Sequence, residues 1–332
     1  RAFPFVKLAS SSTSPCIAMA LLIQTSKRIL GPASSRITSP TRDISSRRSQ
    51  NAVAIVRDIP DSFVDAVVAH SDHPENVSLA VARSQHGEYV AQLRRHVNTV
   101  RLPPLESHPD CLFVEDTVVA MGDTAVVNRL GHVSRRGEVD SLKDLLLQLG
   151  MANLYDMRES NNDEDAGEPA MCDGGDVMHT GRHLFIGMSG RTNANGFKFL
   201  SDAFVSHGVD ADNIVSVPPV VSGKQALHLK SVVTHIDEHT VLAPVGAIGD
   251  TVLDAMKATE RGYNAIRLPD MLSCNAVVVN RHVLAQDAPC EVSKSRIEAA
   301  CEERNLGLTF VDTSELAKKD GALTCCSVLL SV

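Results

Sequence analysis

Pairs of short apolar runs, each pair joined by a turn, recur along the chain about every 45 to 60 residues. Gly, Asp, Asn or His separates the two runs of a pair, as expected for tight turns between strands. Each copy opens with small, polar or charged residues. The copies lie at 114–127, 174–186, 228–242, 274–284 and 325–330. We therefore predict five β-hairpins. Because the last copy lacks a return strand, residues 51–56 are the candidate to supply it.

Helical patterns lie between the predicted hairpins. Four leucines follow the i, i+3, i+4, i+7 spacing of one buried helix face: Leu142, Leu145, Leu146 and Leu149. Residues 251–261 and 293–304 are similar candidates. A unit of strand, strand, helix and strand is too small to bury its own apolar face, so such repeats pack against one another. The pattern predicts an α/β fold, a closed five-bladed α/β propeller of ββαβ units, with an ordinary α/β sandwich as the alternative.

Closure of such a ring would bring the first residues of all five hairpins to one central axis. These residues include Glu115, Asp116, Asp173, Asp176, His228, Asn275 and Cys325. Several carboxylates with one histidine and one cysteine are typical of a catalytic site rather than of a packed core. We therefore expect a central active site.

The first fifty residues differ in composition from the rest of the chain. They contain eight Lys or Arg and one acid, Asp43, and they are rich in Ser and Thr. This composition is typical of an organellar transit peptide, while a disordered extension or a true start at Met19 would also account for it. We predict that residues 1–50 lie outside the fold and that residues 51–332 form a single catalytic domain.

Net charge and cysteine content indicate which ligands and which cellular compartments suit this protein. Residues 51–332 carry 24 basic and 39 acidic side chains, a formal charge of −15, which opposes nucleic acid and suits a small cationic ligand. The longest apolar run, 16–23, is far shorter than the roughly 20 residues that span a bilayer. Seven cysteines follow residue 50 without C-x-x-C spacing, which favours reduced thiols. We expect a cytoplasmic or mitochondrial protein, monomeric or homodimeric, without nucleic-acid or membrane partners.

Cys325 and His228 are the candidates for nucleophilic catalysis. The adjacent Cys325 and Cys326 begin an apolar run, and on a strand their side chains would point to opposite faces, so only one thiol could face a site. The residues alone do not choose between them, and both could be inert core thiols. A nucleophilic cysteine needs a neighbouring imidazole, which His228 could supply and Asp173 could orient. A buried core histidine and a turn aspartate are the alternatives.

Acidic and basic residues suggest how a substrate would bind. Glu115 and Asp116 open an apolar segment, where buried carboxylates need a cationic partner, either a substrate guanidinium or a structural Arg or Lys. Arg135, Arg136 and Arg191 lie in loops before predicted helices. Two converging guanidiniums would bind an amino-acid α-carboxylate, while solvated surface arginines are the alternative.

Six segments in this order resemble one family. They are Asp-Cys-Leu-Phe-Val-Glu-Asp (110–116), Ser-Arg-Arg-Gly-Glu-Val-Asp (134–140), Asp-Gly-Gly-Asp-Val (173–177), Arg-Thr-Asn (191–193), Leu-His-Leu-Lys-Ser (227–231) and Asp-Gly-Ala-Leu-Thr-Cys-Cys-Ser-Val (320–328). Together they resemble dimethylarginine dimethylaminohydrolase, a member of the guanidino-group-modifying (pentein) superfamily of five-bladed α/β propellers. The resemblance runs from about Asn51 to Ser331.

The resemblance implies a reaction and a role for each matching residue. Nω-methylated L-arginine would be hydrolysed to L-citrulline and dimethylamine or methylamine through an S-alkylthiouronium on the cysteine, with no metal and no organic cofactor. The implied catalytic residues are the nucleophile Cys325, the general acid and base His228, and Asp173, which orients His228. The implied binding residues are Glu115 and Asp116 for the guanidinium, Asp110 for the α-amino group, Arg135 and Arg191 for the α-carboxylate, and the main chains of Val68 and Lys319. The family usually has Val at the position of Lys319.

Three other functions stay open at this point. Arginine deiminase acts on unmethylated arginine, but that family generally carries a helical insertion for which residues 135–173 leave no room. An amidinotransferase would need a second amine as acceptor. A non-catalytic protein that binds cationic amino acids would have no need of the thiol.

Overall fold

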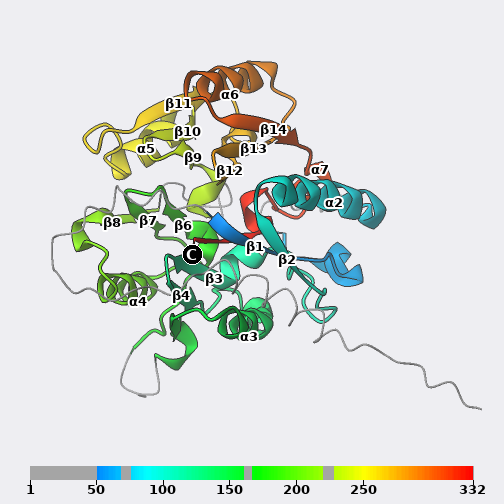
Figure 1. Cartoon of the computed structure of the whole chain (residues 1–332), viewed down its shortest axis with the longest axis vertical. Coiled ribbons are helices and arrows are strands. Elements are labelled where there is room, and N and C mark those ends of the chain that lie inside the picture. Colours follow the sequence, from blue (N-terminus) through cyan, green and yellow to red (C-terminus); the bar gives the residue numbers. More distant parts are fainter. Residues whose placement is uncertain (1–50, 69–75, 161–166, 220–227, 332) are drawn as a thin grey trace, which may run out of the picture.

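The computed structural model describes residues 51–68, 76–160, 167–219 and 228–331. Within these ranges, five three-stranded sheets surround a common centre and the longer helices lie on the outside (Figure 1). The sheets are β15 (Val328–Ser331), β1 (Asn51–Arg57) and β2 (Asn98–Leu102); β3 (Val118–Met121), β4 (Thr124–Val127) and β5 (Asn153–Asp156); β6 (Val177–His179), β7 (Leu184–Gly187) and β8 (Ile214–Val217); β9 (Thr234–Asp237), β10 (Thr240–Pro244) and β11 (Asn264–Leu268); and β12 (Ala276–Val279), β13 (His282–Gln286) and β14 (Gly307–Val311).

Every sheet repeats one pattern. Its first two strands pair antiparallel, and its third strand returns parallel to the second after a helix. The connecting helices are α2 (Leu79–His96), α3 (Asp140–Leu149), α4 (Ala194–Val205), α5 (Ala247–Ala255) and α6 (Glu291–Glu303). A parallel return requires such a long crossover. The predicted five-bladed propeller of ββαβ units is confirmed.

The two ends of the described chain close the ring. Strand β1 pairs antiparallel with β15, with Ala54 opposite Leu329 and Ile55 opposite Val328. This pairing confirms that residues 51–56 supply the missing strand of the last hairpin. The blade that joins the two ends of the described chain therefore has three strands, like the other four.

Helix α3 shows how the apolar pattern becomes packing. Leu142, Leu145 and Leu146 are fully buried against strands of two neighbouring blades, and Leu149 is partly buried beside them. Each fully buried leucine contributes about 1.5–3 kcal/mol relative to exposure. The helix ends at Gly150, whose φ of 78° suits glycine. Similar apolar clusters lie between the other blades.

Two details of the predicted elements are wrong. Helix α5 ends at Ala255 rather than Arg261, because Lys257 adopts a left-handed φ of 50° that cannot continue a helix. The hairpins also do not begin as strands, since each opens with a short 3-10 turn. These turns are η3 (Val114–Thr117), η6 (Gly174–Asp176), η8 (Leu229–Ser231), η9 (Leu272–Cys274) and η10 (Thr324–Cys326). The polar opening residues therefore lie on turns at the centre of the ring.

Two further expectations concern the N-terminal residues and membrane-spanning helices. Residues 1–50, with their expected transit peptide or disordered tail, lie outside the described residues, and the domain boundary at residue 50 stays a prediction. None of the described helices combines the length and apolar character that crossing a membrane requires.

Candidate active site

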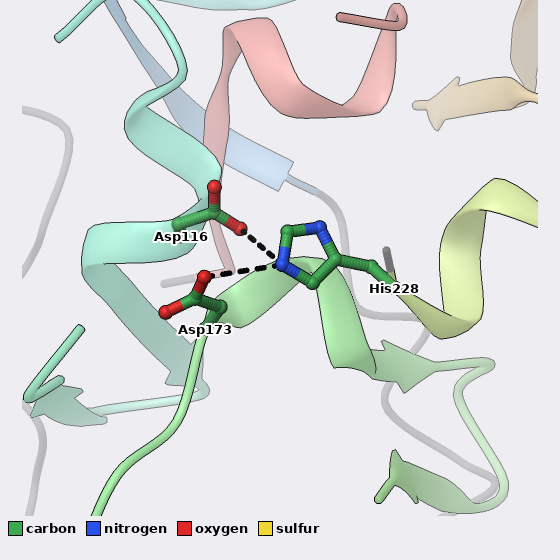
Figure 2. A group of neighbouring side chains, drawn as sticks. All are labelled: Asp116, Asp173 and His228. Carbon is green, nitrogen blue, oxygen red and sulfur yellow. Dashed lines mark hydrogen bonds and ion pairs between the residues drawn. The ribbon is translucent and has the colours of Figure 1, made fainter. Parts of the chain in front are cut away.

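The Nε2 atom of His228 faces two carboxylates that come from different blades (Figure 2). Its Nε2 atom is 3.1 Å from Asp173 Oδ2 and 3.9 Å from Asp116 Oδ1. Burial alone would lower the pKa of His228, but the charge of Asp116 and the hydrogen bond that His228 donates to Asp173 outweigh burial and raise the pKa to about 9. At neutral pH this imidazole therefore carries a proton that it can donate.

The glycines of the Asp-Gly-Gly-Asp segment make room for this arrangement. A Cβ atom on Gly175 would lie 2.6 Å from Nδ1 of His228, and one on Gly174 would lie 2.0 Å from the main-chain oxygen of Glu115. Both distances are far below van der Waals contact. Any larger side chain in turn η6 would push the imidazole or η3 out of place.

Asp116 is the centre of a buried charge network. Its Oδ1 accepts a hydrogen bond from the main-chain N–H of Gly175 at 2.9 Å, and its Oδ2 accepts one from Arg135 Nη1 at 2.6 Å. Burial would raise the pKa of Asp116, yet the charges of His228 and Arg135 lower it to about 2. Asp116 is therefore ionised at any physiological pH.

Arg135 is held by the protein on almost every side. Its Nε bonds both carboxylate oxygens of Glu138 at 3.1 and 3.3 Å, while Nη2 bonds Glu138 at 2.9 Å and the carbonyl of Phe113 at 3.0 Å. Of its N–H groups, one on Nη1 has no partner among the residues that the structure describes. The predicted contact of Arg135 with an α-carboxylate would rest on that single donor, so Arg135 mainly organises the site.

Glu138 is a site residue that the sequence reasoning missed. It is 1% exposed, and its carboxylate accepts the bonds that fix the plane of the Arg135 guanidinium. Burial raises the pKa of Glu138 to about 7, and the charge of Arg135 opposes that rise. The available signal was its position three residues after Arg135, a spacing at which opposite charges meet on one side of a helical turn.

The two adjacent cysteines have different surroundings. Cys325 is partly exposed and lines the same cavity as His228 and Asp173. Cys326 is fully buried in an apolar cluster, and its Sγ lies 3.4 Å from the carbonyl of Ala322. Both belong to turn η10, so the expectation that they point to opposite faces of a strand is wrong in its geometry. Strand β15 begins only at Val328, and turn η10 before it places the Cys325 thiol at the cavity.

Eight of the ten predicted site residues line this one cavity. They are Asp110, Asp116, Arg135, Asp173, Arg191, His228, Lys319 and Cys325. Val67 lines it in place of the neighbouring Val68. The loop that carries Arg191 packs closely on Gly131, where a Cβ atom would lie 2.6 Å from the Arg191 Cα. A cavity with carboxylates, guanidiniums, one imidazole and one thiol is suited to a small zwitterionic molecule with a cationic side chain.

Glu115 is not among the residues that line this cavity. Its Oε1 pairs with Lys230 Nζ at 2.5 Å, and both side chains face a second cavity of about 190 Å³ between the inner strands. Its direct contact with a guanidinium stays a prediction. The fold thus directs two consecutive acids toward two different cavities.

Asp116, Asp173 and His228 have the donor types of a metal site, and their donor atoms lie within 4.8 Å of one another. A metal ion would have to displace the proton from Nε2 of His228 and disturb the ion pair of Asp116 with Arg135. The carboxylates of Asp116 and Asp173 already have cationic partners in Arg135 and His228. A metal-free reaction stays our prediction.

Comparisons with known proteins agree with the fold. The family model described as arginine deiminase matches residues 60–327. The N(G),N(G)-dimethylarginine dimethylaminohydrolase of Pseudomonas aeruginosa is 30% identical over 279 residues, which cover 82% of this chain and 97% of the relative. The enzyme of the same name from Streptomyces coelicolor is 29% identical, covering 83% and 96%.

Among solved structures, a cysteine-to-serine variant of the dimethylarginine dimethylaminohydrolase from Pseudomonas aeruginosa, complexed with citrulline, superposes with a TM-score of 0.71. It is 26% identical, and the match covers 85% of this chain and all of that chain. The extent of these matches shows the relationship. This chain belongs to the dimethylarginine dimethylaminohydrolases within the arginine deiminase family.

Proposed function

We propose that this chain hydrolyses Nω-methylated L-arginine, asymmetric dimethylarginine or monomethylarginine, to L-citrulline and dimethylamine or methylamine. The observation that carries the proposal is one cavity lined by Cys325, His228, Asp116 and Asp173. The relatives bear the name of this activity, and the Pseudomonas aeruginosa protein holds citrulline, the product of such a reaction.

The reaction begins with formation of the thiolate. Burial and the charges of Glu115 and Asp116 raise the pKa of Cys325 to about 12, so the free enzyme holds a thiol. A substrate guanidinium in the cavity would neutralise this negative field, lower the pKa of Cys325 and release its proton to solvent. The thiol would therefore become reactive mainly when a cationic substrate is bound.

Covalent chemistry follows from this arrangement. The Cys325 thiolate attacks the guanidinium carbon, and a C–S bond forms to give a tetrahedral adduct. The His228 imidazolium then donates its proton to the leaving amine as the C–N bond breaks, which leaves an S-alkylthiouronium. His228, now neutral, takes a proton from water, and the hydroxide adds to the same carbon. The C–S bond then breaks to release the thiolate and citrulline, as the proton of the added hydroxyl group passes to solvent.

Substrate binding is proposed to involve the remaining cavity residues. Asp110 and the main chain near Val68 would hold the α-ammonium group, while Arg191 and the remaining N–H of Arg135 would hold the α-carboxylate. Asp116 would face the guanidinium, with Glu115 as a more distant charge. The main chain of Lys319 would complete the rim. No metal or organic cofactor takes part in this scheme.

The cellular setting is also a proposal. All seven cysteines after residue 50 are free thiols, which fits a reducing compartment such as the cytoplasm or the mitochondrial matrix. We further propose that the enzyme acts on a small molecule without nucleic acid or membrane partners, as a monomer or a homodimer.

The test is citrulline formation by the purified full chain from asymmetric dimethylarginine, monomethylarginine and arginine. We expect kcat/KM for a methylated substrate to exceed that for arginine by at least about tenfold. A preference for arginine would make the chain an arginine deiminase. The absence of citrulline from all three substrates would refute the proposal.

A further inference from the structure

A buried lysine side chain lines the candidate active-site cavity together with Cys325 and Asp110. Lys319 is only 6% exposed, although lysine is rarely buried unless its charge is paired. It follows helix α7 (Ser314–Ala317) and precedes turn η10, which carries Cys325. The sequence places a cation here, and among the described residues its ammonium bonds main-chain oxygens.

The ammonium of Lys319 holds a backbone segment that also borders the cavity, through Val67. Its Nζ donates to the main-chain oxygen of Val64 at 2.6 Å and lies 3.5 Å from that of Ala66. These carbonyls are at and just after the C-terminal end of turn η2 (Asp61–Asp65), where oxygens lack partners within the turn. A cation is favourable at such an end because the carbonyl dipoles point toward it.

Asp110 holds the same segment with the opposite charge. Its two oxygens accept the main-chain N–H of Val67 at 3.1 and 3.3 Å. The carbonyls of residues 64 and 66 are thus held by a cation, and the N–H of residue 67 by an anion. Both charged side chains line the cavity, so the segment is held from the substrate side in addition to the packing of Ala66 in the core.

We propose that the side chain of Lys319 is a positioning residue, which together with Asp110 fixes the backbone of residues 64–68 so that main-chain groups there can bind the amino-acid end of the substrate. This inference rests on the proposed function, because Val68 is one of the groups assigned to the substrate's amino group. Burying a cation beside a cationic substrate is costly, and the bonds to Val64 and Ala66 offset that cost.

The test compares Lys319→Met with Lys198→Met in the full chain. Methionine keeps the hydrocarbon part of Lys319 and removes the ammonium, while Lys198 is 73% exposed on α4 and pairs with Asp202. Hydrogen exchange of a peptide covering residues 61–68 reports the tether without any need for catalysis. We expect exchange at least about tenfold faster in Lys319→Met, with wild-type exchange in Lys198→Met.

The kinetic arm uses asymmetric dimethylarginine. We expect KM to rise about tenfold in Lys319→Met with kcat within about threefold of wild type, because binding rather than chemistry is affected. Unchanged exchange would overturn the tether. Faster exchange with an unchanged or lower KM would overturn its role in substrate binding. If wild type makes no citrulline, the proposed function fails, and the exchange result alone decides whether Lys319 fixes the segment.

Discussion

Glu115 and Asp116 are consecutive acids on one short turn, yet they lie in two electrostatically different regions. Asp116 faces two cations, Arg135 and His228, and its pKa is lowered to about 2. For Glu115, burial raises the pKa more than its cationic partner Lys230 and its hydrogen bond with Thr324 lower it. The difference teaches that burial disfavours both charges and that the number of nearby cations decides the direction of each shift. The cavity around Asp116 is therefore a strongly charged site, and the cavity beside Glu115 is a weakly charged one.

The largest expected effect distinguishes Cys325, which lines the cavity with Asp116, from Cys326, which is buried in the core. Cys325→Ser should lower citrulline formation at least about 10³-fold, because a serine hydroxyl is a far weaker nucleophile in this site. Cys326→Ser should keep most of the activity, since its sulfur packs in the core. Steady-state assays of both variants test this prediction. Equal losses, with both variants folded, would contradict the assignment of the nucleophile.

The second prediction compares the two acids directly. Asp116→Asn leaves buried Arg135 and His228 without a shared counter-charge and should lower the free energy of unfolding by about 3 kcal/mol. Glu115→Gln keeps an oxygen that can accept from Lys230 and should cost about 1 kcal/mol. Urea denaturation of both variants at pH 7 measures the difference. A loss in Glu115→Gln as large as in Asp116→Asn would show that the two regions are electrostatically alike.

A third prediction uses pH to examine the His228 network. The pKa of His228 is raised to about 9 from an ordinary value of 6.5, so its stabilising contribution is complete below pH 6.5 and is lost as pH rises through 9. The free energy of unfolding should fall by about 2–3 kcal/mol between pH 6.5 and 9.5. The His228→Gln variant is the control, and it should show a much smaller decline. The same decline in both proteins would contradict this source of stability.

The smallest expected effect concerns metal ions. The acid-and-histidine cluster of Asp116, Asp173 and His228 is balanced by Arg135, so we expect no requirement for a metal. Extended dialysis against EDTA should leave kcat unchanged from that of the untreated protein. Loss of activity that returns with added zinc or magnesium would contradict the metal-free mechanism.

Much of the fold could be predicted because its signals are local. The alternation of apolar runs and turns indicates the hairpins, and the spacing of Leu142, Leu145 and Leu146 indicates a helix whatever surrounds it. The closure of the ring by β1 was predictable for the same reason, since the fifth hairpin lacked a strand. The 3-10 turns were not predictable, because their apolar and polar pattern also fits the first residues of a strand.

By itself, the sequence determined the repeat, the closed ring and the set of segments that reach its centre, since these depend on apolar periodicity within each segment. Only the tertiary structure decided that Cys325 rather than Cys326 lines the cavity and that Asp116 and Glu115 face different cavities. It also decided that Glu138 binds Arg135 and that Lys319 binds the main chain of Val64. These outcomes depend on the direction of each turn and on charges brought together from distant parts of the chain. Asp173 and His228, for example, are 55 residues apart, so no local pattern encodes the 3.1 Å between them.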